Sequence, residues 1–326
     1  MTSTPRFSII VPVYNRPEEV SELLESLVQQ PFRDFEVVLV EDGSTRTCLH
    51  LVSRYVVHFA VRYEFVPNAG PGPARNIGVT LANGRYVIFF DSDCLIPAGY
   101  FSALEKFLSG FPGTNEPQVA WGGPDAGHPS FTPIQQGMAY TMSSVLTTGG
   151  IRGGKQARNN FQPRSFNMGM HRDVFQAAGG FKFDRSAEDI ELSLRIRQLG
   201  FPVGLIEDAF VWHKRRTTLG QFYKQVFRFA EGRVAVARRH PGTLKLVHLF
   251  PMVFTLGWLT TAVLFAFVPA WACAGMLMYL VYLSSVAAGA WLATGSPRVG
   301  LLAIPSVLVQ FAGYGLGMLK ALVHRG

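Results

Sequence analysis

Charged residues and cysteines are both scarce in this sequence. Only 16% of its 326 residues are charged, 48% are hydrophobic, and three are cysteines. A disordered chain combines low hydrophobicity with a high density of charge, so this composition excludes one. Cys48, Cys94 and Cys273 lack the spacing of a disulfide framework or of a cysteine metal site, which is typical of a protein in a reducing compartment.

Charge is absent altogether from two long runs near the C-terminus. No Asp, Glu, Lys or Arg occurs at 246–297 or at 299–319. Because a membrane-spanning helix needs about 20 apolar residues, the first run predicts two such helices, near 246–268 and 270–292. The second run predicts a third helix near 299–320. Buried core helices are the alternative, but they are usually shorter and have a polar edge, so we expect two or three spans.

Positive charge is concentrated just before the first of these runs. Residues 1–210 carry 18 basic and 21 acidic side chains, whereas 211–245 carry nine basic side chains and only one acidic one, Glu231. A basic collar beside a spanning helix is typical of the cytoplasmic side and attracts anionic lipid headgroups. A nucleic-acid patch is the competing interpretation. The position of the collar beside an apolar segment favours membrane lipids, so no nucleic-acid partner is expected.

The N-terminal sequence, MTSTPRFSIIVPVYN, has only a very short apolar run and does not resemble a secretory signal. We therefore expect the first 210 residues to lie in the cytoplasm, attached to the cytoplasmic (inner) membrane by a multi-pass C-terminal segment. Three spans would place Lys320 and Arg325 outside, against the positive-inside bias. A last helix that lies in the interface or re-enters the membrane would remove this conflict.

Apolar runs alternate with helical patterns over the first hundred residues. Strands are predicted at 6–13, 35–40, 61–66 and 85–90, and helices at 17–30 and 71–83. This alternation predicts an α/β fold with a mostly parallel sheet covered by helices on both faces. Ligands of such sheets bind beyond the carboxyl ends of the strands, where polar residues occur at 12–15, 41–44 and 91–93. Residues 124–164 are rich in Gly, Pro, Gln and Ser and predict a long loop of the kind that forms lids.

Asp91 and Asp93 lie two residues apart directly after a predicted buried strand. Their carboxylates suit a hard cation such as Mg²⁺ or Mn²⁺, which favours a few carboxylates together with phosphate oxygens. An Asp-rich turn is the alternative, and the position at the carboxyl end of a strand favours the metal site. Asp42 either accepts a hydrogen bond from a ribose hydroxyl or a base N–H, or belongs to an Asp-Gly turn.

Three features further along the chain each allow two interpretations. Asp189 is either a general base or, with Ser186 as N-cap, part of a helix capping pair. His213 is either a third metal ligand or a structural histidine. The helix predicted at 217–240 interleaves aromatic and basic residues. It therefore either lies in the membrane interface or packs on the domain as a solvated basic helix.

Taken together, these residues resemble the family 2 glycosyltransferases, which have the GT-A fold. The resemblance covers about residues 6–240 and includes six motifs in the family's order. The motifs are Val11-Pro12-Val13-Tyr14-Asn15, Glu41-Asp42-Gly43-Ser44, Gly72-Pro73-Ala74-Arg75-Asn76-Ile77-Gly78, Asp91-Ser92-Asp93, Asn167-Met168-Gly169 and Glu188-Asp189. Each motif is modest alone, but six of them in the right order make the match specific.

The resemblance implies a role for each motif. The residues implied to contact a nucleotide-diphosphate sugar are Pro12, Tyr14, Asn15, Asp42, Arg75, Asn76, Asp91 and Ser92. Asp91, Asp93 and His213 would bind Mg²⁺ or Mn²⁺, and Asp189 would be the catalytic base. The residues implied on the acceptor side are Asn167, Met168, Glu188, Gln225 and Arg228. The last two lie in a Gln-Val-Phe-Arg-Phe segment, which differs from the Gln-x-x-Arg-Trp motif of processive synthases in its final Phe.

The resulting expectation is a GT-A (Rossmann-like) catalytic domain at 1–210, a basic interfacial region at 211–245 and a transmembrane helical domain at 246–326. The few spans, all C-terminal, resemble bacterial enzymes that extend lipid-linked sugars for exopolysaccharide assembly more than processive synthases. The expected reaction is inverting transfer to a lipid-linked saccharide acceptor at the cytoplasmic membrane face. A polyprenyl-phosphate glycosyltransferase is one alternative, and a catalytically silent nucleotide-sugar-binding scaffold is another.

Overall fold

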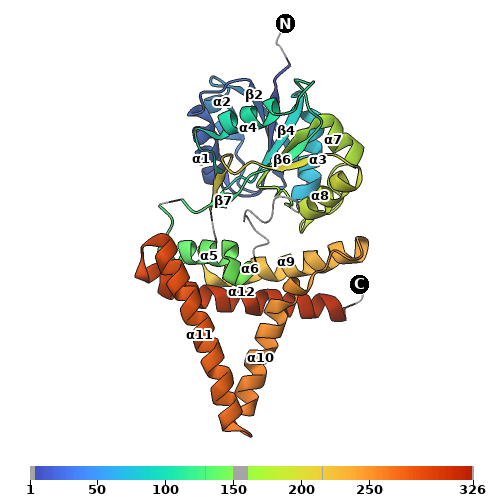
Figure 1. Cartoon of the computed structure of the whole chain (residues 1–326). Helices are drawn as coiled ribbons and strands as arrows, with labels where there is room; N and C mark the ends of the chain where they lie inside the picture. Colours follow the sequence, from blue (N-terminus) through green and yellow to red (C-terminus); the bar gives the residue numbers. More distant parts are fainter. Residues whose placement is uncertain (1–3, 129, 150–160, 215, 325–326) are drawn as a thin grey trace. The chain divides into compact units, whose positions relative to one another are not determined.

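The computed structural model describes residues 4–128, 130–149, 161–214 and 216–324. The chain forms two compact units, one from 1–128 with 158–214 and the other from 129–157 with 215–326. Figure 1 shows the elements of both units, coloured along the sequence. The first unit ends close to the boundary predicted at residue 210. The segment 129–157 belongs to the second unit, although the sequence placed it inside the catalytic domain.

The first unit is built on a seven-stranded sheet with the strand order β3-β2-β1-β4-β8-β6-β9. Its strands are β1 (Phe7–Val13), β2 (Phe35–Asp42), β3 (Ala60–Val66), β4 (Tyr86–Phe90), β6 (Ala120–Gly122), β8 (Asn167–His171) and β9 (Val203–Leu205). The first four pair in parallel, as do β6 and β9, whereas β8 runs antiparallel to both of its neighbours. The prediction of an α/β fold with a mostly parallel sheet is confirmed.

Helices cover both faces of this sheet because its central strands are apolar on both sides. Phe7 and Ile9 of β1 belong to a core with residues of α1 (Pro17–Val28), α2 (Leu49–Tyr55) and α4 (Tyr100–Ser109). Ile10 belongs to the opposite core, with residues of α3 (Pro71–Leu81), α7 (Arg172–Ala178) and α8 (Glu188–Gln198). Successive residues of a strand face opposite sides of the sheet, so a continuous apolar run requires burial on both faces.

A second, three-stranded sheet with the order β5-β10-β7 extends the first unit. Its strands are β5 (Cys94–Leu95), β7 (Asp125–Ala126) and β10 (Val211–His213). β10 pairs antiparallel to β5, and this register places His213 opposite Cys94. The pairing brings the last strand of the unit back to the loop that follows β4.

Among its described residues, the second unit has helices joined by turns and loops, and no strands. Its helices are α5 (Pro133–Ser143), α6 (Val145–Thr148), α9 (Leu219–Arg239), a short 3₁₀ helix (Leu246–His248), α10 (Phe250–Leu264), α11 (Pro269–Thr294) and α12 (Pro297–Val323). The long loop predicted at 124–164 is therefore wrong in part. Thr132 and Gln135 form a capping box around Pro133, which are start signals for α5 that the sequence contains. Residues 150–160 of that segment lie outside the described residues.

Glycines allow α12 to pack closely along α9. A Cβ atom at Gly313 would lie 2.7 Å from Cγ2 of Val226, and one at Gly317 would lie 2.5 Å from the carbonyl oxygen of Phe227. Both spacings are shorter than van der Waals contact, so a side chain at either position would push the two helices apart. The close approach of α9 and α12 therefore depends on glycine.

Polar contacts also join these two helices near the C-terminal end of α12. Arg238 of α9 donates a hydrogen bond of 2.5 Å to the carbonyl oxygen of Ala321. Lys320 of α12 lies 2.9 Å from Glu231 of α9. The contacts run from the middle of both helices to the end of α12, so the two helices lie side by side.

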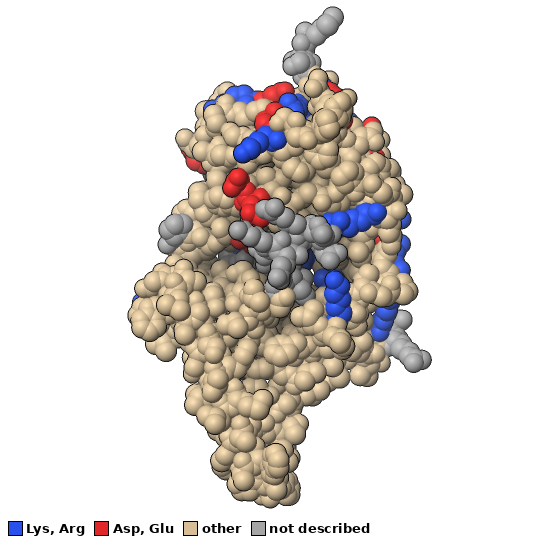
Figure 2. Space-filling view, viewed as in Figure 1, with Lys and Arg blue, Asp and Glu red and all other residues tan. Residues whose placement is uncertain are grey.

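Two helices are long and apolar enough to cross a membrane. They are α11 and α12, with mean hydropathies of 1.6 and 1.7 in their most apolar windows. α10 is apolar but has only 15 residues, fewer than predicted for 246–268. Figure 1 shows α10 and α11 as a hairpin, with α12 lying across its open end beside α5 and α9. The face of this hairpin visible in Figure 2 carries no Lys, Arg, Asp or Glu.

Candidate active site at the carboxyl edge of the sheet

Parallel pairing of β1, β2 and β4 brings their carboxyl ends to one edge of the sheet. Asp91 and Asp93 follow β4 at this edge, and His213 is the last residue of β10. His213 Nε2 lies 3.1 Å from Asp93 Oδ1 and 3.8 Å from Asp91 Oδ2. The structure therefore brings together the three side chains that the sequence predicted as metal ligands.

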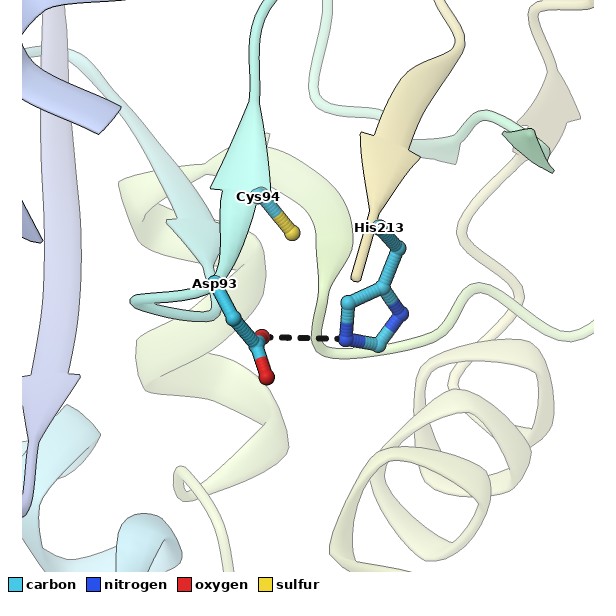
Figure 3. A group of neighbouring side chains, drawn as sticks. All are labelled: Asp93, Cys94 and His213. Atoms are coloured by element: carbon cyan, nitrogen blue, oxygen red, sulfur yellow. Dashed lines mark hydrogen bonds and ion pairs between the residues drawn. The ribbon is translucent and has the colours of Figure 1, made fainter. Parts of the chain in front are cut away.

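Cys94 is a neighbour of this group that the sequence did not single out. One ligand atom each from Asp93, Cys94 and His213 lies within 4.8 Å of the others. Figure 3 shows these three side chains facing one another. Burial raises the pKa of the Cys94 thiol well above its ordinary value, and Sγ donates to the carbonyl oxygen of Phe166 at 3.5 Å. Hard cations such as Mg²⁺ and Mn²⁺ prefer carboxylate oxygen to sulfur, so the aspartates are better ligands for them than Cys94.

The donor set fits a divalent cation such as Mg²⁺ or Mn²⁺. Carboxylates are the protein ligands that these cations favour. Each cation, when held by a few carboxylates, keeps coordination positions open for phosphate oxygens. The Asp93 side chain is 9% exposed, whereas that of Asp91 is 31% exposed. The carboxylate of Asp93 is thus enclosed by protein, and that of Asp91 is partly open to solvent.

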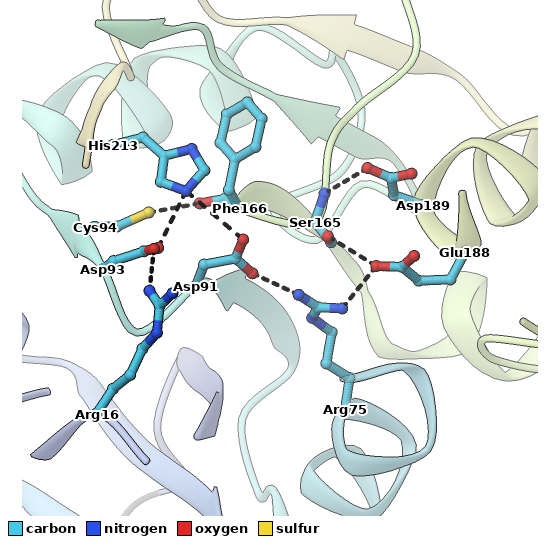
Figure 4. Close-up of polar contacts among 10 residues, drawn as sticks. All are labelled: Arg16, Arg75, Asp91, Asp93, Cys94, Ser165, Phe166, Glu188, Asp189 and His213. Carbon is cyan, nitrogen blue, oxygen red and sulfur yellow. Dashed lines mark hydrogen bonds and ion pairs between the residues drawn. The ribbon is translucent and has the colours of Figure 1, made fainter. Parts of the chain in front are cut away.

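Two arginines pair with the two aspartates, as Figure 4 shows. The Arg16 guanidinium contacts Asp93 Oδ2. Arg75 Nη2 lies 2.5 Å from Asp91 Oδ1, and Arg75 Nη1 lies 3.0 Å from Glu188 Oε1. Arg75 therefore links the loop at 91–93, called the aspartate loop below, to the first residue of α8. Arg16 was not predicted, although its place directly after Asn15, close to the end of β1, was a usable signal.

The start of α8 excludes one of the two interpretations of Asp189. Ala187 is the N-cap, with a left-handed φ of 59°, and no side chain caps the helix. The alternative in which Ser186 and Asp189 form a capping pair is therefore wrong. The Asp189 carboxylate remains at the site, in the first turn of α8.

Asp189 is held by the segment that precedes β8. Its Oδ2 accepts a hydrogen bond from the Ser165 backbone N–H at 3.2 Å, and Arg164 Nη1 lies 3.5 Å from its Oδ1. Both contacts fix the position of the carboxylate in the first turn of α8. Neither Arg164 nor Ser165 was predicted, because a contact across 24 residues leaves no mark in the local sequence pattern.

Glu188 carries the clearest pKa shift at the site. Burial, together with the neighbouring charge of Asp189, raises its pKa to about 7, while Arg75 acts to lower it. Ser165 Oγ also donates to its Oε1 at 3.2 Å. A buried carboxyl group that changes charge near neutral pH is typical of an active site.

Asp42, predicted to contact the nucleobase, holds the segment before α3. Its carboxylate accepts hydrogen bonds from the backbone N–H groups of Ala69 at 2.7 Å and Gly70 at 3.0 Å, and from Asn68 Nδ2 at 3.3 Å. It is 4% exposed. These contacts give Asp42 a structural role in the loop at 68–70, and its contact with a ligand stays a prediction.

Asn15 joins the loops that follow β1 and β2. Its Oδ1 accepts a hydrogen bond from the Thr45 backbone N–H at 2.9 Å, and its own N–H donates to Ser44 Oγ at 2.8 Å. The adjacent Tyr14 is 53% exposed and is available to a ligand, whereas Pro12 lies within β1. Asn15 therefore shapes this edge of the sheet, and Tyr14 presents an open aromatic face there.

Two further residues predicted at the donor are largely enclosed by protein. Asn76 exchanges two hydrogen bonds with the backbone of Phe181, its Nδ2 donating at 2.9 Å and its Oδ1 accepting at 2.9 Å. Ser92, between the two aspartates, is 6% exposed. Asn76 thus ties α3 to the chain that leads into α8, behind the predicted donor position.

The residues predicted on the acceptor side divide between the two units. Asn167 is completely buried, accepting from Tyr100 Oη at 2.9 Å and donating to the carbonyl oxygen of Ala209 at 2.8 Å. Met168 is also completely buried, in the sheet core. Neither side chain reaches the surface, and their place on the acceptor side stays a prediction. Gln225 and Arg228 lie on α9, in the second unit, and their role stays a prediction.

Comparison with protein families gives two matches. The model of glycosyl transferase family 2 matches residues 8–177, more than half of the chain. The model of glycosyl transferase family group 2 matches residues 163–295.

Curated relatives match either a short region or most of the chain. An uncharacterized glycosyltransferase of Rickettsia felis is 40% identical over 103 residues, which is 32% of this chain and 17% of that protein. TarS of Staphylococcus aureus, a poly(ribitol-phosphate) beta-N-acetylglucosaminyltransferase, is 41% identical over 92 residues, or 27% of this chain and 16% of TarS. Glycosyltransferase AglE of Haloferax volcanii is 25% identical over 265 residues, covering 79% of this chain and 83% of AglE. The chain thus spans less than a fifth of the first two relatives and most of the third.

Two solved structures are similar in fold. The mannosyltransferase PcManGT of Pyrobaculum calidifontis, in complex with GDP-Man and Mn²⁺, has a TM-score of 0.57 at 20% identity and covers 100% of this chain and 89% of its own. TarS 1–349 with UDP-GlcNAc has a TM-score of 0.52 at 19% identity, covering 97% and 91%. At these identities the likeness supports the fold and leaves the ligands to separate argument.

Proposed function

We propose that this chain, which belongs to glycosyl transferase family 2, moves a sugar with inversion from a nucleotide-diphosphate donor to a lipid-linked saccharide acceptor at a membrane surface. One observation carries the proposal: Asp91, Asp93 and His213 converge at the carboxyl edge of the sheet, in one network with Asp189. PcManGT and TarS were solved with GDP-Man and with UDP-GlcNAc. Those ligands support a nucleotide sugar as the donor here.

On the donor side, Asp91, Asp93 and His213 would hold Mg²⁺ or Mn²⁺. A divalent cation bound there supplies positive charge to the leaving diphosphate. Arg75 holds Asp91 from the interior side, and Tyr14 offers an exposed ring at the same edge of the sheet. An ion site would suit the diphosphate of such a donor, and an aromatic surface would suit its base.

Asp189 would take the proton of the acceptor hydroxyl. The acceptor oxygen forms its bond to the anomeric carbon on the face opposite the diphosphate, while the bond from that carbon to the diphosphate oxygen breaks. The hydroxyl proton passes to the Asp189 carboxylate, which Arg164 and the Ser165 N–H hold in place. Because there is one displacement, the configuration at the anomeric carbon inverts.

We also propose that α10 and α11 cross the membrane as a hairpin and that α12 lies along its surface. α12 is apolar enough to span, but it packs along α9 (Figure 1). The basic residues of α9 are Lys224, Arg228, Arg233, Arg238 and Arg239. Burying this many charges in hydrocarbon is strongly unfavourable, whereas the interface accommodates a basic amphipathic helix.

This arrangement removes the conflict with the positive-inside bias. A hairpin returns the chain to the side from which it started, so Arg298 and Lys320 lie on the same side as the basic collar at 211–245. Positive residues then flank the membrane on one side only, which is the cytoplasmic side by the usual bias. The acceptor would meet the enzyme at that surface.

A polyprenyl-phosphate glycosyltransferase is a second candidate, and the hydrogen bonding of Asp189 favours it. A phosphate acceptor is already ionised and needs no general base. A carboxylate engaged by Ser165 and Arg164 would then serve structure alone. The two candidates therefore differ in what they require of Asp189.

The substitution Asp189→Asn separates the candidates. With a lipid-diphosphate saccharide as acceptor, we expect kcat to fall by about 10²–10⁴, the usual contribution of a general base, with donor binding unchanged. The assay is metal-dependent release of nucleoside diphosphate across a panel of nucleotide sugars. Full transfer by the variant would exclude Asp189 as the base, and full transfer to undecaprenyl phosphate would establish the second candidate. Asp208→Asn, at an exposed turn, is the matched control and should leave the rate unchanged.

A further inference from the structure

Arg16 occupies one side of the predicted cation position. It follows β1, whose neighbour in the sheet, β4, leads into the aspartate loop. Its guanidinium contacts Asp93 Oδ2, while the other oxygen of Asp93 lies 3.1 Å from His213 Nε2. Both oxygens of Asp93 are therefore engaged by protein groups in this structure.

A divalent cation and this guanidinium compete for the same carboxylate. A cation bound by Asp91, Asp93 and His213 would lie close to Arg16, and the two like charges would repel each other strongly where water is scarce. An arginine stays protonated at any ordinary pH. It therefore has no way to respond to the cation other than to move.

Arg16 has room to move, and Arg75 does not. The Arg16 side chain is 29% exposed and meets one carboxylate. Arg75 is 2% exposed, lies between Asp91 and Glu188, and has its guanidinium 5.6 Å from the ring centroid of Phe181. Of the two arginines that pair with Asp91 and Asp93, Arg16 is the one that a bound divalent cation would displace.

A donor diphosphate offers Arg16 a new partner. The planar guanidinium suits phosphate oxygens, and the residue is the N-cap of α1, where the helix dipole favours a negative charge. Asn15, locked by Ser44 and Thr45, fixes the backbone from which the side chain would swing. The loop is thus rigid, and the side chain is the mobile part.

We propose that Arg16 stands in for the cation in the metal-free protein and shifts to the donor diphosphate when the cation and nucleotide bind together. This inference rests on the proposed function, because it needs the cation and the donor to share the site. It makes the binding of the two cooperative: the cation releases Arg16 from Asp93 for the diphosphate, and the diphosphate draws Arg16 away from the position that the cation needs. Mn²⁺ alone is then bound weakly, and Mn²⁺ with a nucleoside diphosphate tightly.

The test measures Mn²⁺ binding by the full chain in detergent, with free Mn²⁺ read by electron paramagnetic resonance, with and without UDP or GDP. In the wild type we expect either nucleotide that fits to tighten Mn²⁺ binding. In Arg16→Gln, Mn²⁺ alone should bind at least about fivefold tighter, and the enhancement by the nucleotide should shrink by a similar factor. Arg54→Gln, an exposed arginine paired with Glu25, is the matched control and should behave as the wild type.

Each outcome bears on a different claim. Unchanged Mn²⁺ affinity and unchanged enhancement in Arg16→Gln would overturn the role of Arg16 and leave the proposed function standing. Mn²⁺ binding that Asp93→Asn does not weaken would overturn the metal site, and with it this inference. Tighter Mn²⁺ binding with the enhancement retained would also overturn it, because the diphosphate would then not be the second partner.

Discussion

Arg75 is the residue that holds the carboxylates of the site together. It is 2% exposed and bridges Asp91 and Glu188, at 2.5 and 3.0 Å. Asp189 lies next to Glu188, so without this guanidinium three carboxylates would share a poorly solvated region with one fewer positive charge. The raised pKa of Glu188 shows that the balance is already tight with Arg75 present.

Replacing Arg75 should lower the stability of the fold as well as disrupt the site. We expect Arg75→Met to lower the free energy of unfolding by about 3–5 kcal/mol, the usual cost of breaking a buried ion pair on one side. Denaturant unfolding of the full chain in detergent measures it. In the double variant with Glu188→Gln, the loss in the free energy of unfolding should be smaller than the sum of the two single losses. The reason is that Glu188 no longer leaves a buried, unpaired negative charge when Arg75 is absent.

A surface pair gives the matched comparison for that prediction. Arg54 and Glu25 pair at 3.7 Å with both side chains more than half exposed. Arg54→Met should therefore change the free energy of unfolding by less than about 1 kcal/mol, as is usual for exposed pairs. Equal losses for the two arginine variants would contradict the role given to Arg75.

At the scale of elements, the pairing of α9 with α12 is the feature that sets the architecture of the second unit. α9 is basic and α12 is apolar, so each would suggest a different environment if read alone. Gly313 and Gly317 let the two backbones meet. Once paired, the helices must share an environment, and the proposed membrane interface would suit both.

The glycine contact can be tested directly. A Cβ at Gly317 would lie 2.5 Å from the Phe227 carbonyl oxygen, so Gly317→Ala should destabilise the second unit by about 1–3 kcal/mol through overpacking. Thermal unfolding in detergent is the measurement. Gly220→Ala, on α9 with no atom within 4 Å of the new Cβ, should leave the stability unchanged or slightly raised, since alanine favours helix. Equal effects at both sites would refute the close packing.

At the scale of the whole molecule, the number of membrane crossings decides where the C-terminus lies. At 15 residues, α10 alone is short for a membrane span. The apolar segment is longer, because it also includes the 3₁₀ helix before α10 and the turn after it, and covers 246–268. That length suffices to cross the hydrocarbon. A hairpin of this segment and α11 leaves both its ends on one side.

Cysteine labelling of membrane vesicles distinguishes the possible topologies. In a Cys273→Ala background, single cysteines would be introduced as Thr243→Cys, Ala266→Cys, Ser296→Cys and His324→Cys. The hairpin predicts that positions 243, 296 and 324 react from one side and 266 from the other. Labelling of 324 from the same side as 266 would show that α12 crosses the membrane. Cys48 and Cys94 are completely buried, so the background should show no labelling in the folded protein.

Much of the first unit follows from the sequence because its signals are local. The apolar strands, their alternation with helices and the polar residues at the strand ends lie within short windows, and parallel strands place such ends at one edge. Asp91 and Asp93 were predicted for that reason, and His213 through a family resemblance. The mostly parallel sheet and the convergence of these three side chains agree with the structure.

The tertiary structure alone decided which of these groups are engaged, and by what. Arg16 meets Asp93 across 77 residues, and Arg164 meets Asp189 across 25, so neither pairing is visible in a local window. The complete burial of Asn167 and Met168 is likewise a property of the tertiary structure. The sequence by itself determined a mostly parallel α/β sheet followed by an apolar C-terminal segment, because strand patterns and uncharged runs are local, and its motifs carried the resemblance to the family 2 glycosyltransferases. Whether α12 can span depended on its partner α9, because the environment of a helix is set by what it packs against.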